Sequence, residues 1–139
     1  MFLQEYGEKW LDVDGIRTRY FDAGSGRRVV LVHGGTKGDS SGGANAEDFH
    51  LNFAELAKTF HVISVDRLGQ GYTDNPKRDE DWTMAASVRH FVGFLKALDQ
   101  GPYNVVGHCR PRNNACGCPR YRPTSLRTPA ETCVALFLS

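Results

Sequence analysis

The sequence predicts an α/β fold built on a mostly parallel sheet. Three short runs rich in β-branched and aliphatic residues lie at 29–32, 61–65 and 103–106, and the first shows no polar alternation, which is typical of a strand covered on both faces. Stretches with the helical spacing of apolar residues lie between these runs. Alternating strands and helices of this length favour parallel pairing with right-handed crossover connections.

The N-terminal part predicts a β-hairpin. Apolar residues within 9–22 lie on both sides of Asp14-Gly15, a dipeptide suited to the positive φ angles of a tight turn. The run at 29–32 follows after a glycine-rich turn, and we expect it to be a central strand. A hairpin therefore precedes the parallel part of the sheet.

Two amphipathic helices are predicted between the central strands. The first covers residues 47–59, and its apolar residues recur at helical spacing. These residues are Phe49, Phe53, Leu56, Ala57 and Phe60. The second runs from a cap at Thr83 to about Leu98, and Gly101-Pro102 ends it before the third strand.

Composition sets the broad class of protein. The chain has 139 residues, of which 40% are hydrophobic and 24% charged, as is ordinary for one globular domain. No apolar run reaches the length of a membrane span, and residues 1–10 alternate charged and aromatic side chains unlike a signal peptide. We therefore expect a cytoplasmic protein, and the net charge of +1 favours no nucleic-acid partner.

The composition changes abruptly near residue 109. Residues 1–108 hold 12 Lys or Arg and 15 Asp or Glu, whereas residues 109–139 hold five Arg, a single acid (Glu131), four of the six prolines and all four cysteines. Prolines recur there too often for a helix interior or a central strand, and only 134–138 is an apolar run. We expect a domain at 1–109 and a disordered tail at 110–139.

The cysteines and arginines of the tail predict no additional site. Cys116-x-Cys118 matches none of the usual zinc-binding spacings, and the arginines are interrupted by prolines. We therefore expect no metal, and we expect the tail to be solvated. The oligomeric state stays open.

Three motifs follow the three predicted central strands in a fixed order. They are His33-Gly34-Gly35, the stretch from Asp66 to Asp74, and Gly107-His108-Cys109. This order resembles the N-terminal half of the α/β-hydrolase fold over residues 10–109, and the loop after His33 is most similar to that of meta-cleavage-product hydrolases, which break carbon–carbon bonds. Epoxide hydrolases, haloalkane dehalogenases and esterases are neighbouring classes. The resemblance implies a partial α/β-hydrolase sheet, a small-molecule substrate, no membrane partner and no cofactor.

The first motif is the best candidate functional site. A hydrolase of this fold needs backbone N–H groups beside a developing oxyanion, and glycines let the chain approach without a Cβ in the way. The resemblance therefore implies an oxyanion hole at Gly34 and Gly35, with His33 as part of the motif; the alternative is a turn that only connects a strand to a helix. Asn45 is a candidate side-chain donor, as in carbon–carbon bond hydrolases, or else an ordinary polar loop residue.

The second motif resembles the family's D-x-x-G-x-G-x-S-D turn. The resemblance implies an architectural role for Asp66, Gly69 and Gly71, which would brace a tight loop beside the active site. Asp74 stands where a dinucleotide-binding fingerprint has glycine, and its charge would repel phosphate. The stretch is therefore a poor nucleotide site.

The third motif is the nucleophile turn, which the family writes G-x-Nu-x-G. Here it reads Gly107-His108-Cys109-Arg110-Pro111. The resemblance puts Cys109 at the nucleophile position, where Ser is usual, and a thiol is chemically able to serve. Pro111 replaces the last glycine, and it removes an N–H where the next helix should begin.

The sequence provides no catalytic base after this turn. In the family an acid and then a histidine follow the nucleophile, and the histidine takes its proton. Residues 110–139 hold neither a histidine nor an aspartate. We therefore expect a truncated, catalytically incomplete hydrolase; the alternatives are an active Cys-dependent hydrolase completed by a partner chain and a non-enzymatic binding fragment. We hypothesise a frameshift at the turn, because GC-rich coding sequence read out of phase yields Arg, Pro and Cys.

Overall fold

The chain folds around a mixed β-sheet. The structure is a computed structural model that describes residues 2–35, 44–108 and 135–138. Within these residues the sheet has six strands in the order β1-β2-β4-β3-β5-β6. The strands are β1 (Lys9–Val13), β2 (Ile16–Ala23), β3 (Arg28–Val32), β4 (His61–Val65), β5 (Tyr103–His108) and β6 (Ala135–Leu138). The helices are α1 (His50–Ala57) and α2 (Met84–Leu98), with the 3₁₀ turns η1 (Leu3–Tyr6), η2 (Ala46–Phe49) and η3 (Asp79–Asp81).

The predicted hairpin is confirmed. β1 and β2 pair antiparallel, with Val13 opposite Ile16. Asp14 and Gly15 between them both have positive φ, 50° and 79°, as a two-residue hairpin turn of this kind requires. The side chain of Asp12 accepts a hydrogen bond from the Gly15 N–H at 3.0 Å and closes the turn.

The centre of the sheet is parallel, which confirms the predicted α/β class. β3 lies between β4 and β5 and pairs parallel with both. β2 joins the other side of β4 antiparallel, so that the hairpin extends one edge of the sheet. α1 lies on the connection from β3 to β4 and α2 on the connection from β4 to β5. The order of elements is therefore the predicted one.

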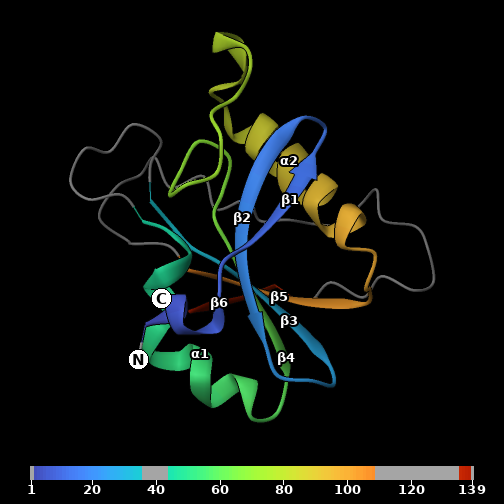
Figure 1. Ribbon diagram of the computed structural model, residues 1–139. Coiled ribbons are helices and arrows are strands. Elements are labelled where there is room, and N and C mark those ends of the chain that lie inside the picture. The colour runs from blue at the N-terminus through green and yellow to red at the C-terminus, as the bar shows by residue number, and fades with distance from the viewer. Residues whose placement is uncertain (1, 36–43, 109–134, 139) are drawn as a thin grey trace.

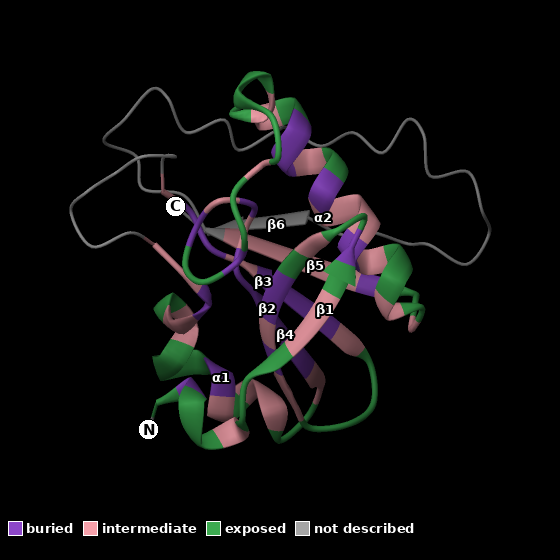
Figure 2. Cartoon of the chain, turned by 45° about the horizontal axis from the view of Figure 1, so that its top comes forward, coloured by how far each residue is buried: buried purple, intermediate pink, exposed green. Residues whose placement is uncertain are grey.

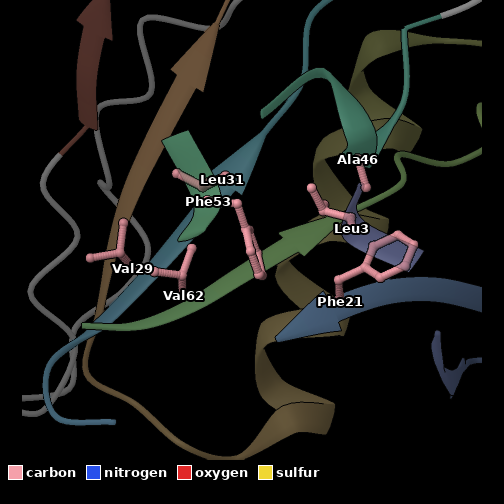
Figure 3. Packing of buried hydrophobic residues seen from close by; sticks show 7 residues of the cluster. All are labelled: Leu3, Phe21, Val29, Leu31, Ala46, Phe53 and Val62. Atoms are coloured by element: carbon pink, nitrogen blue, oxygen red, sulfur yellow. The ribbon is translucent and has the colours of Figure 1, made fainter. Parts of the chain in front are cut away.

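The two helices cover opposite faces of the sheet (Figures 1 and 2). Alternate residues of a strand point to opposite faces, so each strand supplies both cores. The core on the α1 side is shown in Figure 3 and consists of Leu3, Phe21, Val29, Leu31, Ala46, Phe53 and Val62. The core on the α2 side consists of Val13, Val30, Ile63, Val65, Phe94 and Tyr103. The sheet is the middle layer of three.

The first helix is shorter than predicted. Residues 46–49 form a 3₁₀ turn that leads directly into the α-helix, and the side chain of Asn45 accepts a hydrogen bond from the Glu47 N–H at 2.7 Å and caps that turn. The α-helix begins only at His50. The second helix begins where predicted, since the Thr83 hydroxyl accepts a hydrogen bond from the Ala86 N–H at 3.2 Å.

One part of the tail departs from the prediction of disorder. Residues 135–138 form β6, which pairs parallel with β5 from Val105 opposite Ala135 to His108 opposite Leu138. This is the apolar run of the tail, and a neighbouring strand edge gives its backbone hydrogen-bonding partners. Residues 109–134 lie outside the described part of the chain, and their predicted disorder stays a prediction. Among the described helices, none is long and apolar enough to cross a membrane.

Candidate active site

The three motifs begin at one edge of the sheet. Val32, the last residue of β3, lies opposite Val65 of β4 on one side and Gly107 of β5 on the other. The three motifs therefore all begin at the carboxyl ends of the parallel strands. The strand positions at which they begin are level with each other across the sheet to within one or two residues. In open α/β sheets this edge is where ligands bind.

His33 is a buried histidine that links two of the motifs. Its side chain is 1% exposed, its Nε2 accepts a hydrogen bond from the Arg67 N–H at 3.0 Å, and its Nδ1 lies 2.8 Å from the Gly34 carbonyl oxygen. Since Nε2 accepts, Nδ1 carries the proton and donates to Gly34. Burial lowers the pKa of His33 below its ordinary value, and the positive charge of Arg67 lowers it further. The hydrogen bond to Gly34 raises the pKa, but by less than burial lowers it. His33 is therefore a neutral ring with both nitrogens in use.

Gly34 and Gly35 form the turn that leaves β3. Gly35 has φ of 96°, and a Cβ built on it would lie 2.8 Å from the Cβ of Ala44. Only glycine fits this position, because the backbone is in the left-handed region and the space is filled. The contact also shows that the two described ends of the 34–45 loop touch each other. The predicted oxyanion role of the two amides stays a prediction.

Asn45 lies at the far end of the same loop. Its Oδ1 accepts the hydrogen bond that caps η2, so the oxygen of the amide is committed to local structure. The same bond fixes the rotation of the side chain. Its predicted role as a donor to substrate therefore depends on the remaining amide nitrogen.

Asp66 is the centre of the second motif. Its carboxylate is fully buried and accepts hydrogen bonds from the N–H of Ala46 at 2.7 Å, the N–H of Tyr72 at 2.8 Å and the Nε of Arg19 at 2.7 Å. A Cβ built on Gly71, whose φ is 56°, would overlap this carboxylate. One buried carboxylate therefore links η2, the turn at Tyr72 and β2, and its predicted bracing role beside an active site stays a prediction.

Gly69 has a steric role of its own in this turn. Its φ is 69°, and a Cβ there would lie 2.8 Å from the ring of Trp82. The Gly69 N–H also donates to the carbonyl oxygen of Asp74 at 3.0 Å, which closes the turn. Asp74 in turn receives the N–H of Arg17 on its side chain at 3.1 Å, so the turn is tied to β2.

Arg19 is the functional-site neighbour that sequence reasoning missed. It lies on β2, and its side chain is fully buried between acids from three different segments. These acids are Asp66 at 2.7 Å, Glu8 at 3.2 Å and Glu47 at 3.8 Å. The sequence held one signal for the burial of Arg19. It lies two residues before the apolar Phe21, and alternate residues of a strand lie on the same face of a sheet.

The third motif is only partly described. Gly107 lies within β5, and His108 is its last residue. Cys109, the predicted nucleophile, lies outside the described residues. No group of three or more His, Cys, Asp or Glu side chains among the described residues could hold a metal ion.

Comparison with known proteins identifies the fold family. A profile of the alpha/beta hydrolase fold matches residues 27–110, more than half of the chain. The chain belongs to the α/β-hydrolase family. The chain is 36% identical over 104 residues to 2-hydroxy-6-oxo-6-(2'-aminophenyl)hexa-2,4-dienoic acid hydrolase from Metapseudomonas resinovorans. It is 35% identical over 94 residues to 2-hydroxymuconate semialdehyde hydrolase from Pseudomonas sp. (strain CF600).

The match covers the N-terminal portion of this fold. It includes 74% and 68% of this chain but only 34% and 31% of the two relatives, so the chain spans about a third of their length. The solved structure of a meta-cleavage product hydrolase from Pseudomonas fluorescens IP01 superposes with a TM-score of 0.63 and 30% identity, over 72% of this chain and 35% of that one. The predicted resemblance to the meta-cleavage-product hydrolases is confirmed.

Proposed function

We propose that this chain supplies the oxyanion side and the nucleophile turn of a hydrolase site for the ester or carbon–carbon bonds of small molecules. The observation that carries the proposal is the strand register. Val32 lies opposite Gly107, so the glycine turn after β3 and the nucleophile turn after β5 start from adjacent parallel strands. Neighbouring strands are about 4.8 Å apart, which brings an attacking atom and the backbone N–H groups within reach of one carbonyl group.

The names of the relatives support the proposed substrate class. Those reported above are named as hydrolases of a dienoic acid, of a muconate semialdehyde and of a meta-cleavage product. We extend this to a small unsaturated oxo acid or a simple ester for the present chain. No cofactor is needed for such a reaction, because water and a positioned nucleophile suffice.

The proposed chemistry begins at the thiol of Cys109. Its sulfur forms a bond to the substrate carbonyl carbon, and the π electron pair moves to the oxygen, which the N–H groups of Gly34 and Gly35 would stabilise. The thiol proton needs an acceptor. Residues 110–139 contain no histidine, and His33 already uses Nε2 to accept from Arg67 and Nδ1 to donate to Gly34.

We therefore propose that these 139 residues alone do not turn over substrate efficiently. The test is hydrolysis of p-nitrophenyl acetate and of a meta-cleavage product by the purified chain, with and without added imidazole. Imidazole can take the thiol proton, so it should accelerate hydrolysis beyond its own background rate. The acceleration should vanish in Cys109→Ala and persist in the matched control Cys116→Ala.

Two results would count against this proposal. Turnover without imidazole that is lost in Cys109→Ala would show that the chain already has a base. Equal rates for the wild-type chain and Cys109→Ala at every imidazole concentration would show that Cys109 is not the nucleophile.

A further inference from the structure

A fully buried arginine lies beside the candidate site without any part in the proposed chemistry. Arg19 is 0% exposed and bonds to acids that come from before β1, from η2 and from the end of β4. The ring of Tyr72 lies 4.3 Å from the guanidinium carbon and the ring of Phe21 5.1 Å. Burial lowers the pKa of Arg19, but the hydrogen bond to Asp66 and the other acids outweigh it, so the pKa is raised.

This arrangement is not explained by stability alone. Removing an arginine and a carboxylate from water is costly, and an apolar pair of similar volume is often at least as stable. A buried ion pair does, however, fix geometry, because a planar guanidinium donates in set directions. The question is therefore which geometry Arg19 fixes.

The Asp66 carboxylate, which binds Arg19, also binds the backbone of Ala46. Asp66 Oδ1 accepts from the Ala46 N–H at 2.7 Å, and the Ser64 hydroxyl donates to the Ala46 carbonyl oxygen at 2.8 Å. Ala46 is thus held through both backbone groups by residues at the end of β4. It is the point at which the loop that begins at Gly34 rejoins the fold.

The contact continues from Ala46 to the glycine turn. Ala44, two residues before Ala46, lies directly against Gly35, where an added Cβ would be 2.8 Å from the Ala44 Cβ. The position of Gly35 is therefore set on one side by the chain that Ala46 anchors. A continuous series of contacts leads from Arg19 through Asp66 and Ala46 to Gly35.

We propose that Arg19 is a positioning residue for the glycine turn at Gly34 and Gly35, acting by holding the Asp66 carboxylate against the Ala46 N–H. The proposed catalytic purpose of this turn rests on the function proposed above, whereas the positioning itself does not. Without Arg19, the Asp66 carboxylate would be buried without a cationic partner and would turn toward water. The Ala46 N–H would then lose its acceptor, and the approach of Ala44 to Gly35 would loosen.

The test is amide hydrogen exchange, measured residue by residue by NMR on the full chain, which needs no turnover. In Arg19→Met, exchange protection of Ala46 and Tyr72 should fall by about tenfold or more, the amount expected when local opening replaces a charged hydrogen bond. The central strand amides of Val30 and Ile63 should keep the protection they have in the control. That control is Arg17→Met, which makes the same change at an exposed arginine of the same strand.

A second variant keeps the proposal testable if Arg19→Met does not fold. Arg19→Lys retains the charge but loses the fork of donors, and it should lower protection of Ala46 and Tyr72 selectively, by a smaller factor than Arg19→Met. The proposal is overturned if the Ala46 amide in the folded variants keeps its protection within about twofold, the scatter expected of such measurements. It is also overturned if Ala46, Val30 and Ile63 lose protection by the same factor. Failure of the hydrolysis assay would leave either exchange result intact.

Discussion

Gly71→Ala should be among the most damaging single-methyl substitutions in the described part of the chain. Gly71 has φ of 56°, and its added Cβ would overlap the carboxyl group of Asp66. Backbone strain of this kind costs about 1–3 kcal/mol. The displaced carboxylate would also strain or break three hydrogen bonds, and each bond to a charged group contributes about 1.5–3 kcal/mol.

A matched control separates these two effects. Gly7 also has positive φ, 79°, but a Cβ there would meet nothing within 4 Å. Gly7→Ala therefore carries only the backbone cost, and we expect Gly71→Ala to lower the free energy of unfolding by about 2 kcal/mol more than Gly7→Ala does. Urea denaturation followed by circular dichroism measures both. Equal losses, within about 0.5 kcal/mol, would refute the reasoning that the buried carboxylate sets the space at Gly71.

Three further predictions concern the core, a helix cap and a titration. Phe53→Ala removes a fully buried ring and should lower the free energy of unfolding by about 3–5 kcal/mol. Leu51→Ala, at an 81% exposed position of the same helix, should change it by less than about 0.5 kcal/mol. Similar losses in the two variants would contradict the assigned faces of α1. Thr83→Ala removes the acceptor of the Ala86 N–H and should cost about 1 kcal/mol in urea denaturation, and no loss would show that the cap contributes nothing. Burial lowers the pKa of His33 below 6.5 in the folded chain, so as the pH falls its ring is protonated in the unfolded chain before it is protonated in the folded chain. The free energy of unfolding should therefore decrease as the pH drops below 6.5. An NMR titration midpoint of His33 at or above 6.5 in the folded chain would contradict this.

Much of the fold could be predicted from local sequence signals. Asp14-Gly15 specified the hairpin turn, and Thr83 marked the start of α2, because a positive φ and a cap are each properties of one or two residues. The apolar runs of β3 and β4 indicated strands buried on both faces, as the structure shows, whereas β5 is only half-buried after Tyr103. These signals need no knowledge of distant partners.

The features that the sequence did not reveal depend on distant partners. The alternation with Phe21 was a local signal for the burial of Arg19, but no local signal identified its partner Asp66, which lies 47 positions away in the sequence and 2.7 Å away in space. β6 is another example, since an apolar run of four residues becomes a strand only when the edge of β5 is beside it. The start of the first helix is a third example, since the apolar pattern did not distinguish the 3₁₀ turn η2 from the α-helix that follows it.

The most direct test of the proposed site is the response of two backbone amides to an oxyanion. A trifluoromethyl ketone should add slowly to Cys109: the sulfur–carbon bond forms, the carbonyl oxygen gains the electron pair, and the thiol proton passes to water. If Gly34 and Gly35 donate to that oxygen, their ¹H–¹⁵N signals should move downfield in the adduct, with no change in Cys109→Ala. An adduct on Cys109 that leaves both glycine signals in place would contradict the proposed oxyanion hole, and absence of any adduct would contradict the proposed nucleophile.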